Sequence, residues 1–184
     1  SCVFSSTVKG CFDRRENSKF SKEDKGIFFY NGGHFQKWGI DHGMADMTKE
    51  DLSKEYQSQL GKDLPLEFGG TQLAGGIKTS AQTYALFLQK VLKGNLRIKE
   101  FLGKDAICTL PASCASSRSS PIPLDWHYSY GHWVEDDSEK GDGSFSSAGL
   151  FGFYPWIDHN KKFYGLISRH KTPSLGDEIG SGLG

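Results

Sequence analysis

The chain has 184 residues, with 22 basic and 22 acidic side chains, 36% hydrophobic residues and 13% aromatic residues. This composition indicates a globular protein with a buried core, of a length that suits one domain, and it excludes a disordered chain. A formal net charge of zero argues against proteins that bind nucleic acid or anionic membranes, and no apolar run approaches the roughly 18 residues of a membrane span.

The first part of the chain predicts a loop followed by a short strand. Residues 1–25 are charged and loop-like. Gly26–Tyr30 is an apolar run that ends at Asn31-Gly32-Gly33, a strong turn signal. We therefore expect a strand over 26–30.

Two helices are predicted next. The first begins after Thr48, which forms a capping-box pattern with Asp51, and ends at Gly61. The second covers Ser80–Lys93, where one apolar stripe recurs at helical spacing. Thr79 or Ser80 can cap its start.

The last third of the chain has the pattern of strands. In Trp126–Tyr130, aromatic residues alternate with other types at period two. Phe145–Ile157 and Phe163–Ser168 follow, and the four residues Asp158–Lys161 between them predict a hairpin.

The order of these elements predicts an α+β fold in which an antiparallel sheet is flanked by helices. We expect a helical region over about 26–102, a surface loop rich in Ser and Pro over about 103–125, and antiparallel strands over about 126–170. Residues 171–184 are rich in Gly and Ser, which is typical of a flexible tail.

The four cysteines form two sequence-local pairs, Cys2 with Cys11 and Cys108 with Cys114. Neither spacing matches a zinc knuckle, and both pairs lie in polar, turn-rich stretches that favour disulfides. Four free thiols in a cytosolic protein are the alternative. Paired cysteines predict an oxidising compartment: secreted, periplasmic or lumenal.

Most sites that can be recognised from motifs are excluded. The six histidines form no metal-ligand pattern, neither glycine pair continues as a phosphate-binding loop, and the Gly-x-Ser-x-Gly nucleophile elbow does not occur. We therefore expect no metal and no cofactor. Ser-x-x-Lys, which can place an amine beside a nucleophilic hydroxyl, occurs at Ser6–Lys9 and at Ser168–Lys171. Neither lies at the start of an amphipathic helix, so neither is predicted to be a nucleophile.

Four segments of the chain carry recognisable motifs. A glycine pair leads into a helix in Leu73-Ala74-Gly75-Gly76-Ile77-Lys78-Thr79-Ser80, which continues to Leu88. The most specific segment is Ser146-Ser147-Ala148-Gly149-Leu150-Phe151-Gly152-Phe153-Tyr154-Pro155-Trp156-Ile157-Asp158, with Phe163–Ile167 after it. The other two are Tyr128–Glu135 and Phe28–Gln36.

Together these segments resemble the serine β-lactamase-like hydrolases, which include class C β-lactamases, D,D-peptidases and related esterases. The resemblance covers most of residues 1–170. Residues 146–158 are similar to the Lys-Thr-Gly or His-x-Gly strand of that family, and residues 163–167 to the final strand of its sheet. Tyr128–Glu135 resembles the preceding Tyr-Gly-x-Gly-Trp strand, and Phe28–Gln36 resembles the segment with the catalytic Tyr-x-Asn.

The resemblance assigns roles to several residues. Tyr30 matches the tyrosine that takes part in general-base catalysis. The asparagine that contacts substrate in that family lies two positions after this tyrosine, whereas Asn31 lies one position after Tyr30. Ser147-Ala148-Gly149 matches the third motif, in which Ser147 replaces a cationic residue, Ala148 contacts substrate and Gly149 lets substrate lie against the strand. The N–H of Leu150 would be one donor of the oxyanion hole.

In that family the nucleophile lies far upstream of the tyrosine, whereas Tyr30 has only 29 residues before it. The resemblance therefore implies the C-terminal part of a β-lactamase-like serine hydrolase that acts on a small-molecule or peptide-like ester or amide. The nucleophile would come from the remainder of the same protein upstream of Ser1, and this chain alone would be inactive. The alternative is a non-catalytic binding or assembly module with the same fold, which the Ser147 replacement and the altered Tyr-x-Asn spacing favour.

Overall fold

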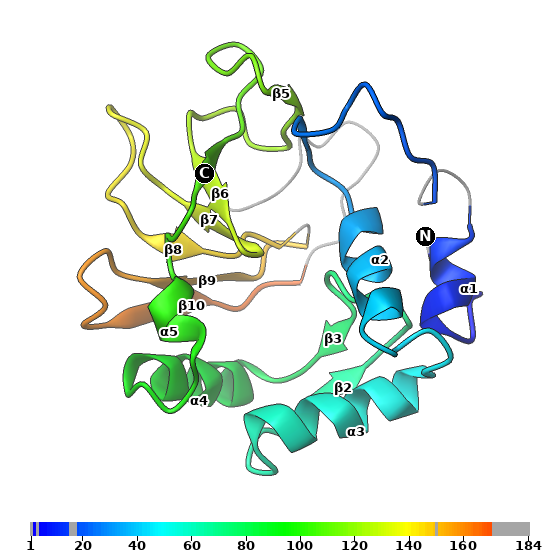
Figure 1. The fold of residues 1–184 in the computed structure, drawn as a ribbon. Helices are drawn as coiled ribbons and strands as arrows, with labels where there is room; N and C mark the ends of the chain where they lie inside the picture. Colours follow the sequence, from blue (N-terminus) through cyan, green and yellow to red (C-terminus); the bar gives the residue numbers. More distant parts are fainter. Residues whose placement is uncertain (1, 3, 15–17, 150, 171–184) are drawn as a thin grey trace. The chain divides into compact units, whose positions relative to one another are not determined.

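The structure is a computed structural model that describes residues 2, 4–14, 18–149 and 151–170. It has a mixed α+β architecture with helices and antiparallel sheets, as the sequence predicts (Figure 1). The chain forms two compact units, and each is described by itself. The first unit comprises residues 1–23 and 31–84, and the second comprises residues 24–30 and 85–184. The predicted tail, 171–184, lies outside the described residues.

The first unit contains three helices and one short hairpin. The helices are α1 (Val8–Phe12), α2 (Gly33–Asp41) and α3 (Lys49–Leu60), and the hairpin pairs β2 (Glu67–Phe68) with β3 (Ile77–Lys78). Its core is formed by the buried side chains of Val8, Leu52 and Phe68. Five partly buried residues pack around these three: Ile40, Met44, Met47, Tyr56 and Leu73.

A buried glutamine joins the parts of the first unit. Gln36 on α2 is 2% exposed, and its Nε2 donates to the carbonyls of Val8 (3.2 Å) and Thr71 (3.0 Å). Its Oε1 accepts a hydrogen bond of 2.5 Å from the N–H of Leu73. One side chain therefore satisfies three backbone groups that come from α1 and from the connection between β2 and β3.

Helix α3 begins and ends as the sequence predicts. The Thr48 hydroxyl accepts from the N–H of Asp51 (3.2 Å), and the Asp51 carboxylate accepts from the N–H of Thr48 (3.2 Å), which completes the capping box. Gly61 follows the helix with φ of 112°, a backbone angle that glycine adopts without strain.

Two helices of the first unit were not predicted individually. Residues 1–25 were expected to be a loop, but they contain α1, whose N–H at Gly10 is capped by the Thr7 hydroxyl (3.1 Å). Five residues are too few to show a helical period. Helix α2 begins directly at the predicted turn, where the Asn31 side chain accepts from the N–H of Gly33 (2.7 Å).

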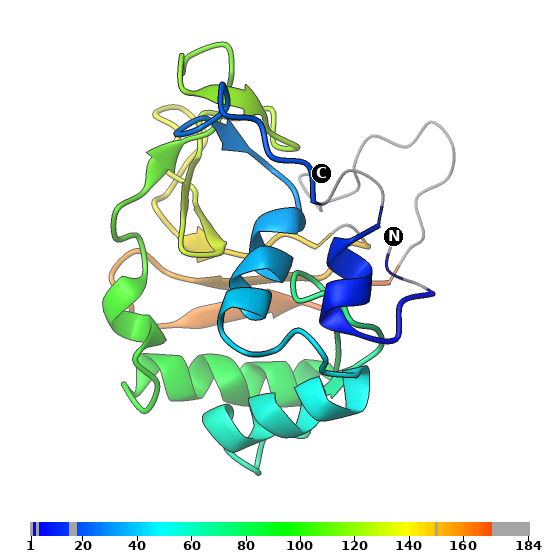
Figure 2. The ribbon, with the colours of Figure 1, turned by 45° about the vertical axis from the view of Figure 1, so that its right-hand side comes forward.

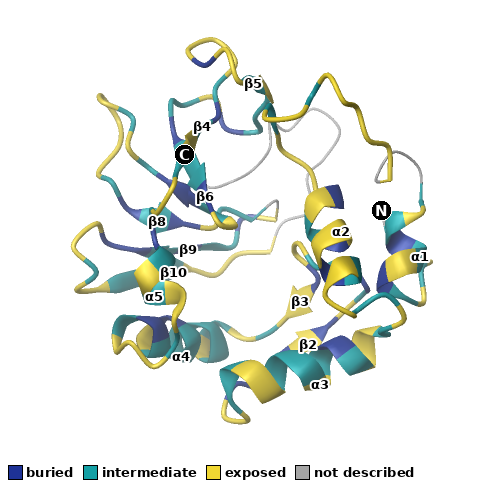
Figure 3. Ribbon diagram, in the orientation of Figure 1, coloured by how far each residue is buried: buried dark blue, intermediate teal, exposed yellow. Residues whose placement is uncertain are grey.

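The second unit is built on a six-stranded antiparallel sheet in the order β10-β9-β8-β7-β6-β4. The strands, in chain order, are β4 (Ile107–Cys108), β6 (His127–Ser129), β7 (His132–Val134), β8 (Phe145–Ser146), β9 (Tyr154–Ile157) and β10 (Tyr164–Ile167). A separate parallel pair is formed by β1 (Phe28–Phe29) and β5 (Ser117–Ser119). Buried residues lie mainly on β6 to β9, whereas β10 is intermediate to exposed (Figure 3).

Two helices accompany this sheet. Helix α4 (Ala81–Leu92) matches the predicted helix, and the Ser80 hydroxyl caps it by accepting from the N–H of Thr83 (3.1 Å). The boundary between the units falls within α4. The later part of α4 lies beside β10 in both views, where Gln89 Nε2 donates to the Tyr164 hydroxyl (3.0 Å) (Figure 1 and Figure 2). Helix α5 (Ile98–Phe101) follows.

One row of paired residues crosses the sheet. Trp133 pairs with Ser146, Ser146 with Trp156, and Trp156 with Gly165. Directly paired side chains project from the same face, so this row defines one face of the sheet. A Cβ on Gly165 would lie 1.9 Å from the Trp156 ring, so this position accepts only glycine.

Two predictions about the second unit need correction. The segment Phe145–Ile157, expected as one strand, is divided into β8 and β9 by residues 147–153. The expected loop over 103–125 contains two strands: β4, which pairs with β6, and β5, which pairs with β1.

The predicted hairpin is confirmed as β9 and β10. Its turn is held by the Asp158 carboxylate, which accepts from the N–H groups of Lys162 and Phe163 (both 2.6 Å).

The cysteines pair as predicted, Cys2 with Cys11 and Cys108 with Cys114, at Cα–Cα distances of 5.0 and 5.9 Å. None of the four is free. Among the helices of the described ranges, none has the length and apolar character that crossing a membrane requires.

Thiol titration checks the disulfides. In denaturant without reductant, none of the cysteines should react with a thiol reagent, and after reduction all four should react. Replacing Cys108 and Cys114 by serine should lower the free energy of unfolding by about 2 kcal/mol, because the unfolded chain regains the entropy of a short closed loop. Four thiols in the unreduced protein would contradict both pairs.

A second prediction concerns Gln36. Gln36→Leu should lower the free energy of unfolding by about 3 kcal/mol, because it removes three hydrogen bonds to backbone groups and places an apolar side chain against them. Urea denaturation measures this loss. Gln59→Leu, at an exposed position on α3, is the matched control and should change stability little. Equal effects of the two variants would contradict the central role of Gln36.

Candidate functional site

The predicted motif Ser147-Ala148-Gly149 directly follows β8. Ser147 is exposed, and its N–H donates to the carbonyl of Pro155 on β9 (3.1 Å). Gly149 N–H donates to the carbonyl of Phe153 (2.8 Å), which closes the connection to β9. Leu150, the predicted oxyanion donor, lies outside the described residues.

This motif has one open edge. On the other side of β8, pairing with β7 ends at Trp133 and Ser146, because β7 begins at His132 and the chain turns away there. Backbone groups of successive residues in an extended strand point to opposite edges. Ala148 therefore directs its N–H and C=O away from β9, and neither has a hydrogen-bond partner among the described residues. An extended acyl or peptide-like group could pair with them.

Gly149 has no room for a side chain. A Cβ at this position would lie 2.9 Å from the carbonyl oxygen of Phe153, closer than such atoms approach in proteins. The connection from β8 to β9 therefore depends on glycine at this position.

Tyr30 lies on an aromatic cluster of the second unit. Its ring stacks on Trp133, with centroids 5.4 Å apart and planes 28° apart, and meets Tyr128 edge-on at 5.8 Å. Its N–H donates to the carbonyl of Ser119 (3.2 Å). Burial raises the pKa of Tyr30, although 41% of the residue is exposed. The hydroxyl therefore holds its proton at neutral pH.

The structure brings some of the predicted residues together and separates others. Trp133, which stacks against Tyr30, is paired with Ser146, so Tyr30 lies on the face of the sheet that carries Ser146. Strand alternation directs the side chain of Ser147 to the opposite face. Asn31 belongs to the first unit, where its side chain begins α2.

The Ser-x-x-Lys pattern that the structure describes in full, Ser6–Lys9, is not a serine–lysine pair suited to nucleophilic catalysis. Ser6 and Lys9 are both exposed, and the Lys9 side chain pairs with the Asp13 carboxylate rather than with Ser6. Lys171, the lysine of the second pattern, lies outside the described residues. Within the same described ranges, no group of three or more His, Cys, Asp or Glu side chains is arranged to hold a metal ion.

A polar cluster on the Trp133 face was missed at the level of sequence. The Tyr154 hydroxyl donates to the Glu135 carboxylate. Burial raises the pKa of Glu135, while the hydroxyls of Ser146 and Tyr154 oppose this shift. Ser146 Oγ is buried beside them and forms no hydrogen bond of good geometry. Glu135 and Tyr154 are 19 residues apart, so no local motif could indicate their contact.

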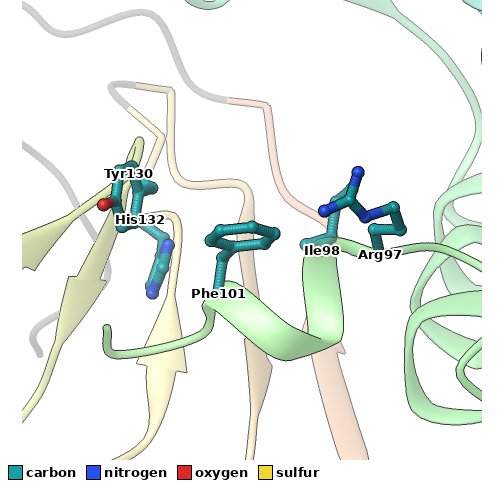
Figure 4. A pocket seen from close by; sticks show the side chains of 5 residues that line it. All are labelled: Arg97, Ile98, Phe101, Tyr130 and His132. Atoms are coloured by element: carbon teal, nitrogen blue, oxygen red, sulfur yellow. The ribbon is translucent and has the colours of Figure 1, made fainter. Parts of the chain in front are cut away.

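A pocket of about 390 Å³ was also missed. It is lined by Arg97, Ile98, Phe101, Tyr130 and His132, which come from the α5 region and from the turn between β6 and β7 (Figure 4). His132 Nε2 accepts from the N–H of Gly103 (2.9 Å). Burial, with a smaller contribution from the nearby Lys161 ammonium, lowers the pKa of His132 to about 4, while a hydrogen bond to the backbone of Tyr130 opposes the shift. The imidazole is therefore neutral at physiological pH.

Comparisons with known proteins identify no relative. No protein-family model, curated protein or solved structure matches the chain.

The lowered pKa of His132 predicts a dependence of stability on pH. The unfolded state takes up this proton near pH 6.5 and the folded state only near pH 4, so stability falls as the pH drops through this window. The loss should be on the order of 2 kcal/mol at pH 4. Urea denaturation at several pH values measures it.

The matched variant is His132→Gln, whose amide oxygen can accept from Gly103 but does not titrate. Carboxylates contribute equally to both proteins, so the difference between their pH profiles isolates His132. Parallel profiles would contradict the neutral, buried state of this histidine.

Proposed function

We propose that this chain is part of a β-lactamase-like serine hydrolase, which cleaves an ester or amide through an acyl-serine intermediate. A segment upstream of Ser1 would supply the serine nucleophile and its lysine. The open edge at Ala148, beside a position that accepts only glycine, is the observation that carries this proposal. Two disulfides are in keeping with an extracellular, periplasmic or lumenal enzyme.

In this proposal the substrate lies along the open edge. The backbone of Ala148 pairs with the substrate, and Gly149 allows its backbone to approach closely. The serine Oγ attacks the carbonyl carbon while its proton passes to a base, and the carbonyl oxygen becomes an anion. The N–H groups of Leu150 and of the nucleophile would stabilise that anion. The leaving group then departs with a proton, and water hydrolyses the acyl-serine by the same steps.

Tyr30 acts in this scheme as a proton relay. A phenol whose pKa is raised by burial is a poor base by itself, but a cation close to its oxygen would lower the pKa. The lysine of the Ser-x-x-Lys segment would provide that cation. The proposal therefore requires this lysine to lie beside the Tyr30 hydroxyl, which has no hydrogen-bond partner in the described part of the chain.

A non-catalytic binding or assembly module is the second candidate. Ser147 provides no positive charge where the resemblance places lysine or histidine, and the pKa of Tyr30 is raised rather than lowered. Both observations favour a protein that binds at the open edge without turning over a substrate.

Labelling by a fluorophosphonate distinguishes the two candidates. The natural protein, with all residues that precede Ser1, should be labelled at a serine of an upstream Ser-x-x-Lys sequence and should hydrolyse p-nitrophenyl acetate. Tyr30→Phe should lower kcat/KM about 100-fold, because general acid–base catalysis contributes this much. Residues 1–184 alone should show neither labelling nor hydrolysis.

Tyr56→Phe is the matched control, because Tyr56 is also partly buried with a pKa raised by burial, and it packs on Phe68 in the first unit. It should leave kcat/KM unchanged. A natural protein that is neither labelled nor active supports the non-catalytic module, and labelling at a serine within residues 1–184 contradicts the proposed origin of the nucleophile.

A further inference from the structure

The pocket beside α5 has two aromatic walls. Phe101 and Tyr130 meet edge to face, with ring centroids 5.7 Å apart and planes 81° apart, and Ile98 lies on the other side of Phe101 (Figure 4). Its volume of about 390 Å³ is within the range of about 300–1,000 Å³ that small-molecule sites occupy. Tyr130 is 64% exposed, so its ring is available to a ligand.

Strained backbone surrounds this pocket. In the described residues, three positions other than glycine have positive φ: Asp105 (50°), Tyr130 (36°) and Lys161 (56°). The Tyr130 hydroxyl donates to the Asp105 carboxylate (2.7 Å), so a hydrogen bond joins two of these three residues. Lys161 donates to the carbonyl of Leu102 (3.2 Å), just after α5. Strained residues persist where the surrounding structure holds them, and they gather at ligand sites.

Tyr130 is the least expected of the three. Tyr130 and Gly131 form the two-residue turn between β6 and β7, and both have positive φ, as in a type I′ turn. Asparagine is the preferred first residue of such a turn, and an aromatic side chain is unfavourable there. A tyrosine at this position places a ring against the pocket at a cost in backbone energy.

The charges at the pocket favour an anion. The Arg97 guanidinium lies 5.8 Å from the centroid of the Phe101 ring, and the Lys104 ammonium lies 5.4 Å from it. No carboxylate pairs with Arg97 in the described residues. Asp105, whose carboxylate is bonded to the lining, accepts from the Tyr130 hydroxyl (2.7 Å).

We propose that this pocket binds a small planar carboxylate, with its aromatic ring against Phe101 and Tyr130 and its carboxylate on the Arg97 guanidinium. A guanidinium offers paired N–H donors that match a carboxylate, and aromatic walls suit a flat apolar body. This site does not depend on the proposed hydrolase. His132 lines the pocket and its neighbour Trp133 stacks against Tyr30, and successive residues of a strand face opposite sides of the sheet.

Calorimetric titration with 2-naphthoate tests the proposal. The full chain should bind one equivalent in the millimolar range or tighter, and the neutral 2-naphthamide should bind about tenfold more weakly. Arg97→Gln should weaken naphthoate binding about tenfold, which is the contribution of one charge-assisted hydrogen bond. Lys140→Gln, at an exposed position in the loop between β7 and β8, removes the same charge and should leave binding unchanged.

Tyr130→Asn separates binding from folding. It should change the melting temperature little, because the better fit of asparagine to the type I′ turn opposes the loss of the hydrogen bond to Asp105, and it should weaken naphthoate binding at least threefold through loss of the ring. Unchanged naphthoate binding by this variant would overturn the role of the Tyr130 ring. The proposal is overturned if naphthoate and naphthamide bind equally, if neither binds, or if Arg97→Gln and Lys140→Gln bind naphthoate alike.

Discussion

Pairing between β7 and β8 determines which side chains of the second unit can act together. Trp133 and Ser146 are direct partners, so they share a face with the Tyr30 ring. Their neighbours His132 and Ser147 project to the other side. The two residue pairs of this ladder thus place the rings that contact Tyr30 on one face of the sheet and the pocket beside α5 on the other. The open edge at Ala148 begins where the pairing between β7 and β8 ends.

The two candidate sites differ in how they depend on the described residues. The pocket is complete within the second unit, since its walls, its guanidinium and the bonds that hold its strained turn are all present. The proposed acyl-transfer site has an open edge and a tyrosine, but the proposal requires a nucleophile and a cation from another segment. Tyr30 therefore has the pKa of a buried phenol rather than that of a base.

Local chemistry explains which elements could be predicted from the sequence. Thr48 with Asp51, and Ser80, cap helices through contacts within three residues, so their signals are contained in the sequence. Asn31 was misleading because a side chain that accepts from the backbone two residues later can begin either a turn or a helix.

The pocket could not be predicted, because α5 and the turn at Tyr130 are about 30 residues apart and share no motif. The open edge at Ala148 depends on where β7 ends, which the apolar pattern of 145–157 does not reveal.

The β7–β8 ladder also restricts how the length of this chain can vary. One extra residue within β7 would move Trp133 to the pocket face and bring the residue before it onto the Tyr30 face, so both sites would be lost together. The connection from Asp136 to Gly143 carries no such requirement and is largely exposed. Between the start of β7 and the end of β8, insertions and deletions in natural variants are therefore compatible with both sites in that connection but not in the two strands.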